Sequence, residues 1–276
     1  MQPFDISILV LAYNSSKYVA ECLNSVFLQN FTGSVQLIFL DDNSTDDTET
    51  IARSVLEKKI KAHWAVHFET NSVNLGSYLN LKKGLKIAQG KFIAYLEGDD
   101  IWVDKNKLTT QYQFLTKNDS YDAFACGCNF IDENGIQLPQ LYYKELREKT
   151  FHNKDLWGYP PFQTSGVMFR NISQLKLPDS SINTNCNDKI LFVLCSISKP
   201  IYYNPEKMIA YRYHKGNLTS NYSEYQNTVS RALVTNSFLI KHVGLKFLPS
   251  YLNAFVVFLK TYGIKIVQRI RSQQIL

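Results

Sequence analysis

Runs of apolar residues alternate with helical stripes along the first hundred residues. Four mostly apolar runs predict strands that are covered on both faces, as in a parallel sheet. They span residues 6–11, 35–40, 63–68 and 92–96, the third being the weakest. Between them, apolar residues recur at intervals of three and four in three stretches, residues 19–27, 51–56 and 81–88. This order predicts an open α/β sheet with right-handed crossovers.

Polar residues in front of the helical stripes are expected to begin the helices. Ser15 or Ser16 precedes the first stripe, and Asp46 followed by Glu49 resembles a capping box for the second. Asp104 is available to cap a later helix that carries Leu108 and Leu115.

The second half of the chain is less regular. Its pattern predicts strands at residues 123–131, 167–169 and 207–213 and a buried helix at residues 189–198. From residue 224 onward the pattern is helical. We therefore expect a main α/β domain at residues 1–222, followed by a helical C-terminal extension at residues 223–276.

The composition is that of a globular protein. The 276 residues are 45% hydrophobic and 20% charged, which excludes a disordered, collagen-like or low-complexity chain. Thirty Lys and Arg residues against 24 Asp and Glu residues leave a net charge of +6. This mild excess suits an anionic partner or a membrane surface, and it is far from a nucleic-acid-binding signature, so no nucleic-acid partner is expected.

Cysteine usage and apolar stretches indicate a reduced, cytoplasmic chain. The five Cys residues lack disulfide-scaffold spacing, and Cys126 and Cys128 have no second pair to complete a zinc site. We expect buried free thiols. No signal peptide is recognisable, and the uncharged, mostly apolar stretch at residues 247–259 is shorter than the roughly 18 to 20 apolar residues that span a bilayer.

Polar residues follow each of the first four predicted strands. They are Ala12-Tyr13-Asn14, Asp41-Asp42-Asn43, Asn71 with Asn74-Leu75-Gly76, and Glu97-Gly98-Asp99-Asp100. Ligands of open α/β sheets bind beyond the carboxyl ends of the strands. Asp and Asn are also common in ordinary turns, but their occurrence after all four strands favours a binding site at this edge.

The adjacent carboxylates Asp99 and Asp100 are the most specific indication of a chemical site in the sequence. They repel each other unless a cation lies beside them, and carboxylates suit Mg²⁺ or Mn²⁺ completed by phosphate oxygens and water. Capping of the following helix is the alternative, for which Asp104 is already available. Asp42 can accept a hydrogen bond from a base N–H or a ribose hydroxyl. The alternative role for Asp42 is to cap the following helix. No dinucleotide fingerprint follows the first strand.

These motifs resemble the inverting nucleotide-sugar glycosyltransferases of family 2, which have the GT-A fold. The likeness covers about residues 5–220 and is most specific over the first 115. It is carried by Ile8–Asn14, Leu40–Asp46, Asn74–Gly76, Asn80, Gly90-Lys91, Glu97–Trp102, Lys107-Leu108, Gln111, Thr164–Met168, Asn187-Asp188 and Tyr211–His214. It implies a Rossmann-like, mostly parallel sheet flanked by helices, with a nucleotide-sugar-binding half at residues 1–115 and an acceptor-binding half at residues 116–222.

The resemblance also implies roles for individual residues. Those that would bind the nucleotide sugar are Ala12, Tyr13, Asn14, Asp42, Asn74, Asn80 and Asp99. Asp100 and His214 would hold Mn²⁺ or Mg²⁺, Asp188 would be the catalytic base, and Thr164 and Ser165 would lie on the acceptor side. Asn187-Asp188 departs from the family's usual E-D or G-D pair, and Asp188 is equally placed to cap a helix.

The reaction so implied is metal-dependent transfer from a nucleotide sugar, expected to be UDP-linked. The acceptor would be a hydroxyl of a glycan or lipid-linked glycan in surface polysaccharide synthesis. The alternative is a non-catalytic nucleotide-sugar-binding or assembly protein on the same fold. A nucleotidyltransferase would need a Gly-rich, basic loop after the first strand, and residues 12–16 do not form one.

The C-terminal extension combines an apolar stripe with basic residues. The apolar positions are Leu248, Leu252, Phe255, Val256, Leu259, Tyr262, Val267 and Ile270. The basic ones are Lys260, Lys265, Arg269 and Arg271. This pattern predicts peripheral attachment to the inner face of the cell membrane, where anionic headgroups attract the positive charge. Packing on the catalytic domain, or on a second copy in a homodimer, is the alternative.

Overall fold

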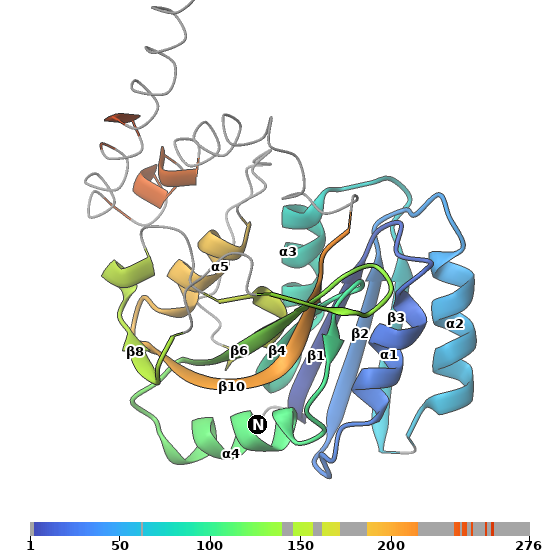
Figure 1. Ribbon diagram of the computed structural model, residues 1–276, viewed down its shortest axis with the longest axis horizontal. Coiled ribbons are helices and arrows are strands. Elements are labelled where there is room, and N and C mark those ends of the chain that lie inside the picture. Colours follow the sequence, from blue (N-terminus) through green and yellow to red (C-terminus); the bar gives the residue numbers. More distant parts are fainter. Residues whose placement is uncertain are drawn as a thin grey trace, which may run out of the picture.

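The computed structural model describes residues 3–61, 63–139, 146–156, 162–171 and 187–214, together with residues 235–237, 239–241, 244, 252, 255 and 256. Its first hundred residues confirm the predicted alternation of strands and helices (Figure 1). The elements are β1 (Phe4–Ala12), α1 (Val19–Phe27), β2 (Val35–Asp41), α2 (Thr48–Lys59), β3 (Trp64–Thr70), α3 (Ser77–Ile87) and β4 (Gly90–Glu97).

The remaining named elements include both short and long strands. They are β5 (Ile101–Trp102), α4 (Lys107–Lys117), β6 (Ala123–Ile131), β7 (Gln137–Leu138), β8 (Lys149–Phe151), β9 (Val167–Arg170), α5 (Asn187–Cys195) and β10 (Ile201–Arg212). Two short 3₁₀ turns, η1 (Asn153–Leu156) and η2 (Thr164–Gly166), precede β9. β10 begins at Ile201, earlier than the sequence pattern predicted, and the two-residue strand β5 was not predicted.

The strands form a mostly parallel sheet in the order β3-β2-β1-β4-β9-β6-β10-β5. β3, β2, β1 and β4 are mutually parallel, as are β6 and β10. β9 is antiparallel to both β4 and β6 and joins the two parallel groups. Because the chain leaves β1 first towards β2 and later returns to β4, the strand order reverses at β1, which is where open α/β sheets bind ligands.

Helices cover both faces of the sheet, and β1 supplies alternate residues to both cores. Ile8 and Val10 of β1 face the core that is formed with α1, α2 and α4. Leu9 and Leu11 face the opposite core, formed with α3 and α5. All four side chains are at most 5% exposed. Burial of each such side chain stabilises the fold by about 1.5–3 kcal/mol, so the central strand is held firmly from both sides.

The helix-start predictions hold only in part: Asp104 accepts the backbone N–H of Asn106 just before α4 at 2.8 Å, but neither predicted serine caps α1 through its side chain. The backbone carbonyl of Ser15, rather than a serine hydroxyl, accepts the N–H groups of the first turn of α1. Asp46 accepts the backbone N–H of Ser16 at 3.1 Å, and Glu49 pairs with Arg53 at 2.8 Å, so no capping box forms. Asp46 also accepts the backbone N–H of Thr48, the first residue of α2, at 3.1 Å, so it satisfies a donor at the start of this helix while it ties the loop after β2 to the loop after β1.

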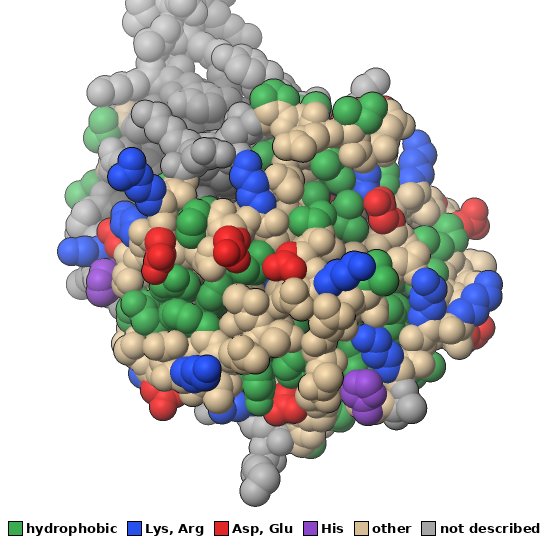
Figure 2. Space-filling model, turned by 60° about the horizontal axis from the view of Figure 1, so that its bottom comes forward, with side chains coloured by type: hydrophobic (Ala, Val, Ile, Leu, Met, Phe, Trp, Pro, Cys, Tyr) green, Lys and Arg blue, Asp and Glu red, His purple; other side chains and the backbone are tan. Residues whose placement is uncertain are grey.

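The described residues test two predictions about the whole chain only in part. Cys22, Cys126, Cys128 and Cys195 are free thiols, as expected. Among the helices that the structure describes, none combines the length and hydropathy that crossing a bilayer requires. Most of residues 223–276 lie outside the described residues, so the predicted membrane attachment and the domain boundaries stay predictions. On the face shown in Figure 2, Lys and Arg side chains are interspersed with Asp and Glu side chains.

Candidate active site at the carboxyl edge of the sheet

The loops after β1 and β2 are joined by side-chain hydrogen bonds. Asn14 and Asn43 adopt left-handed backbone conformations, with φ of 49° and 60°, which Asn tolerates better than most residues. The backbone N–H of Asn14 donates to Ser44 Oγ at 2.8 Å, and Asn14 Oδ1 accepts the N–H of Thr45 at 2.8 Å. The two loops therefore form one rigid unit beside Tyr13, whose side chain is half exposed.

Asp42 organises the loop that follows β3. Its carboxylate is 3% exposed and accepts the backbone N–H groups of Leu75 and Gly76 at 2.8 and 2.9 Å. Asn71 donates to it as well, at 2.8 Å, and also donates to Asn80 Oδ1 at 3.0 Å. Asp42 thus holds the loop in place from its buried side, leaving one lone-pair position on Oδ2 without a donor in the described contacts.

Asn74 and Asn80 take different positions, although both were predicted to bind the nucleotide sugar. Asn74 is exposed, and its side-chain oxygen accepts the N–H of Gly76 at 3.0 Å. Asn80 is 2% exposed and lies behind Asn71. The Asn80 amide supports the residues that hold Asp42, and its contact with the nucleotide sugar stays a prediction.

The turn after β4 approaches β1 closely. The backbone N–H of Gly98 donates to the carbonyl of Leu11 at 2.8 Å. A Cβ at residue 98 would lie 2.9 Å from Ala12 Cβ and 3.1 Å from the Leu11 carbonyl oxygen, so glycine alone fits without displacement. This close approach sets Asp99 and Asp100 directly beside the end of β1.

Asp100 is buried and held on both carboxylate oxygens. It is 2% exposed, accepts the hydroxyl of Ser165 at 2.5 Å on Oδ2, and accepts the backbone N–H of Arg212 at 3.0 Å on Oδ1. Burial raises the pKa of Asp100 well above its ordinary value, and the charge of Asp99 raises it further, while the bonds from Ser165 and Arg212 oppose the shift. A cation beside Asp100 would offset both the burial of its carboxylate and the repulsion from Asp99.

Asp99 is the more accessible carboxylate and lies beside His214. Its side chain is 24% exposed, and its Oδ2 lies 3.0 Å from His214 Nε2. The His214 ring packs at 4.9 Å from the ring of Tyr18. The structure therefore brings His214 to Asp99 of the carboxylate pair, and its role as a metal ligand stays a prediction.

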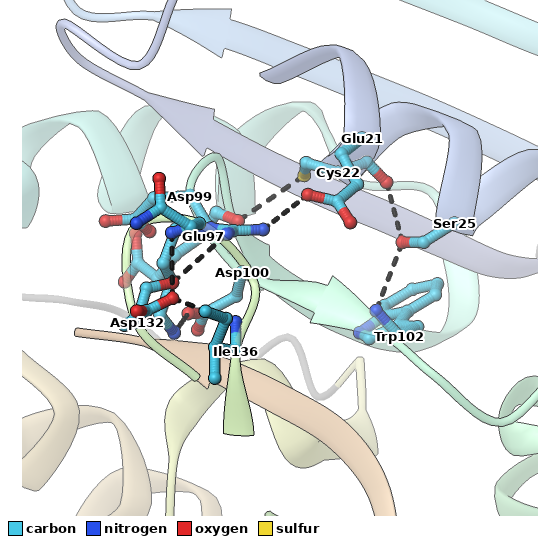
Figure 3. Close-up of polar contacts among 11 residues, drawn as sticks. Glu21, Cys22, Ser25, Glu97, Asp99, Asp100, Trp102, Asp132 and Ile136 are labelled. Atoms are coloured by element: carbon cyan, nitrogen blue, oxygen red, sulfur yellow. Dashed lines mark hydrogen bonds and ion pairs between the residues drawn. The ribbon is translucent and has the colours of Figure 1, made fainter. Parts of the chain in front are cut away.

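Arg212 fills the space beneath this turn. It is among the largest fully buried side chains, and its guanidinium contacts the carbonyl oxygens of Asp99 and Asp132 and the carboxylate of Glu21. Figure 3 shows Glu21, Asp99, Asp100 and Asp132 gathered in one small region from separate parts of the chain. A buried cation among these groups partly neutralises the acidic turn.

A second buried network holds Ser165 from below. Trp102 Nε1 donates to the carbonyl of Ser165 at 2.9 Å, and Gln111 Nε2 donates to that of Gly166 at 2.9 Å. Lys107 Nζ in turn donates to Gln111 Oε1 at 2.9 Å and lies 4.2 Å from the centre of the Trp102 ring. Ser165 is fully buried and supports Asp100, whereas Thr164 is partly exposed. The acceptor-side role of both residues stays a prediction.

The predicted base lies at the start of α5. Asp188 is the second residue of this helix, but its side chain lies outside the described residues, so its role stays a prediction. A cavity of about 470 Å³ lies near the start of β10, lined by residues 152–154 and 196–200. It contains none of the residues predicted to carry chemistry.

The residues at the carboxyl edge fit a divalent cation that is shared with a ligand. Within the described part of the chain, no three His, Cys, Asp or Glu side chains form a metal-holding group by themselves. Asp99 and Asp100 are adjacent carboxylates and His214 contacts Asp99, so these side chains could supply part of a cation's ligands. Mg²⁺ and Mn²⁺ are commonly bound through one or two carboxylates, with phosphate oxygens and water completing the shell.

The fold and this site define an α/β protein that carries several carboxylates at the edge of the sheet where the strand order reverses. The sequence profile described as "Glycosyl transferase family 2" matches residues 7–173, more than half of the chain. The chain therefore belongs to glycosyl transferase family 2, as the sequence motifs predicted.

Curated relatives are distant and largely uncharacterised. An uncharacterized protein of Mycobacterium tuberculosis (strain H37Rv) is 28% identical over 212 residues, covering 76% of this chain and 59% of the relative. The chain thus spans about three fifths of that relative's length. An uncharacterized glycosyltransferase of Rickettsia prowazekii is 27% identical over 278 residues, covering 94% of this chain and 80% of the relative.

Solved structures share the fold at low identity. The first 349 residues of S. aureus TarS superpose with a TM-score of 0.65 at 19% identity, covering 94% of this chain and 74% of that chain. TarS has also been solved with UDP and with UDP-GlcNAc. The mannosyltransferase PcManGT from Pyrobaculum calidifontis, in complex with GDP-Man and Mn²⁺, gives a TM-score of 0.64 at 14% identity, covering 92% and 70% of the two chains. These similarities confirm the predicted GT-A type of fold.

Sequence reasoning missed two contributors to the site. Arg212 lies within the Tyr211–His214 motif but was given no role, and Glu21 was not noticed. Arg212 could have been noticed as a cation in a predicted strand, since a buried charge needs a partner. Glu21 offered no signal, because it lies on the polar side of an amphipathic helix, where a charged residue is ordinary.

Proposed function

We propose that this chain is an inverting, divalent-cation-dependent glycosyltransferase. It transfers a sugar from a nucleotide sugar, UDP-linked, to a hydroxyl of a glycan or lipid-linked glycan in surface polysaccharide synthesis. The observation that carries the proposal is the convergence of Asp42, the Asp99–Asp100 pair and His214 at one edge of a family 2 fold. Neighbours of this fold that bind UDP, UDP-GlcNAc and GDP-Man with Mn²⁺ support the same donor class.

The donor's nucleoside is assigned to the unit formed by the loops after β1 and β2. The half-exposed Tyr13 offers an aromatic face, and Asn14 and the chain around Ala12 form the floor. Asp42 fixes the neighbouring Asn74 loop and keeps one lone-pair position for a base N–H or a ribose hydroxyl.

The diphosphate is assigned to the Asp99–Asp100 turn. Asp100 and His214 would hold Mn²⁺ or Mg²⁺, with Asp99 directed to the ribose or sugar. The cation would neutralise the charge that builds on the departing nucleoside diphosphate. Ser165 and the backbone of Arg212 keep the Asp100 carboxylate fixed before the donor binds, which lowers the cost of assembling the site.

Acceptor activation is assigned to Asp188 at the start of α5. A carboxylate there would take the proton of the acceptor hydroxyl as it attacks the anomeric carbon, with Thr164 beside the acceptor. A single displacement of this kind inverts the anomeric configuration.

Hydrolysis of a panel of nucleotide sugars tests the proposal. We expect release of a nucleoside diphosphate from one donor in Mn²⁺, suppression by EDTA, and loss of release in Asp99→Asn. Asp119→Asn, at an 87% exposed carboxylate on the surface, is the matched control and should keep release. Donor binding without turnover, with or without any acceptor glycan, would instead support the alternative, a non-catalytic nucleotide-sugar-binding or assembly protein.

A further inference from the structure

Arg212 is a buried cation that is held in place by hydrogen bonds from its guanidinium. Its side chain is 2% exposed. Nε donates to the carbonyl of Asp99 at 3.0 Å and Nη1 to that of Asp132 at 3.3 Å, while its backbone N–H holds Asp100. A single residue therefore fixes both members of the carboxylate pair, one through its backbone carbonyl and the other through its carboxylate.

Glu21 supplies the carboxylate partner of this cation in the described part of the chain. Its Oε2 lies 2.5 Å from Arg212 Nη2, although the Glu21 side chain is 56% exposed. The two residues are 191 positions apart, so the pair joins the first turn of α1 to the end of β10. The other two described acceptors of the guanidinium are neutral carbonyl oxygens, so Glu21 provides the opposite charge.

The same end of α1 contacts His214. Tyr18 lies three residues before Glu21, its ring centre 4.8 Å from the Arg212 guanidinium and 4.9 Å from the His214 ring. Tyr18 and Glu21 thus hold Arg212 and His214 from one helix face. Figure 3 shows Glu21 on α1 directed towards the region of Asp99 and Asp100.

We propose that Glu21 is a positioning residue of the Asp99–Asp100 site. By holding the Arg212 guanidinium, it keeps that charge away from the carboxylates and keeps the turn in the shape that receives a cation. Without Glu21, the acidic residues along the contacts of Arg212 are Asp99, Asp100 and Asp132. The Asp132 carboxylate already accepts the backbone N–H groups of Asn134 and Ile136, so the guanidinium would compete with the cation for Asp99 and Asp100. This inference rests on the proposed function.

A purely structural role for the pair makes a different prediction. If the pair only stabilised the fold, its loss would weaken all ligand binding equally and lower the melting temperature. Loss of a positioning residue would instead weaken only the part of UDP binding that depends on the divalent cation. Residues that support metal ligands from behind typically change metal affinity about 10–100-fold when they are replaced.

Calorimetric titration with UDP, in Mn²⁺ and in EDTA, separates these roles. We expect Glu21→Gln to weaken UDP binding in Mn²⁺ at least about tenfold and to leave binding in EDTA unchanged. Glu49→Gln is the matched control, because Glu49 also pairs with an arginine, Arg53, on the exposed surface of the next helix. It should bind like the wild type under both conditions. Should Glu21→Gln fail to fold, Glu21→Asp, with its carboxylate set back by one methylene, should weaken the Mn²⁺-dependent component alone.

The outcomes separate this inference from the proposed function. Wild-type affinity in Glu21→Gln, or equal losses in Mn²⁺ and EDTA, would overturn the role of Glu21 while leaving the proposed function standing. A wild type that shows no Mn²⁺-dependent UDP binding would overturn the assigned UDP- and cation-dependent function, and this inference with it.

Discussion

Lys107 gives the folded chain a pH dependence that can be worked out from the structure. Its side chain is fully buried between the Trp102 ring and Gln111. Burial lowers its pKa from 10.5 to about 8, while nearby Cys126 and Asp104 oppose the shift. At any pH at which Lys107 stays protonated, its buried ammonium group therefore destabilises the folded state.

The sign and size follow from proton linkage. The unfolded chain keeps the Lys107 proton up to a pH of 10.5, whereas the folded chain loses it near pH 8. Between these values the unfolded state binds more protons, so the free energy of unfolding rises with pH. A pKa difference of about 2.5, at about 1.4 kcal/mol per unit, gives about 3 kcal/mol over the whole range. Below pH 8 the full cost is present.

Urea denaturation of the wild type and Lys107→Met measures this contribution. The difference in unfolding free energy between the two, wild type minus variant, should rise by about 1–2 kcal/mol between about pH 8 and about pH 9.5. The lost hydrogen bond to Gln111 adds an offset that does not depend on pH. Lys105→Met, at an exposed lysine two residues earlier, controls for removing one lysine charge. A difference that stays flat across this range would refute the reasoning.

Three further changes test other parts of the account. Gly98→Ala places a methyl group 2.9 Å from Ala12 Cβ and should cost about 1–3 kcal/mol of stability; an unchanged urea midpoint would contradict the close approach. Asp188→Asn should keep donor binding and reduce sugar transfer at least about 100-fold, and near-normal transfer would place the base elsewhere. Truncation after Tyr222 should abolish flotation with anionic liposomes if the C-terminal extension attaches the chain to membranes; equal flotation of both forms would contradict that role.

The first half of the fold was readable from sequence because its pattern is local. Strands β1, β2 and β4 are nearly continuous apolar runs, β3 is a weaker one, and the helices between them have apolar stripes. β10 was predicted too short because Asn204-Pro205-Glu206 interrupts its apolar pattern, where its pairing with β6 shifts register. Which strands pair with β9 depends on contacts between distant segments, which no local pattern records.

Site residues that directly follow strand ends could be predicted from the sequence. Site residues whose contacts depend on packing between distant segments could not. Asp42, Asp99 and Asp100 were found because carboxylates cluster after strands. Ser165 was placed on the acceptor side, but its hydroxyl bonds Asp100 from below. The contact of Glu21 with Arg212 joins positions 191 residues apart, and only the folded chain reveals it.

The central claim is that the Asp99–Asp100 turn binds a nucleoside diphosphate together with a divalent cation. Calorimetry with UDP in Mn²⁺ and in EDTA, on the wild type and on Asp100→Asn, tests it most directly. Asn keeps an oxygen that can accept the Arg212 N–H, so the substitution removes mainly the charge. The account predicts that the wild type binds UDP more tightly in Mn²⁺ and that Asp100→Asn loses this gain. Equal affinity and equal Mn²⁺ dependence in the two proteins would contradict it.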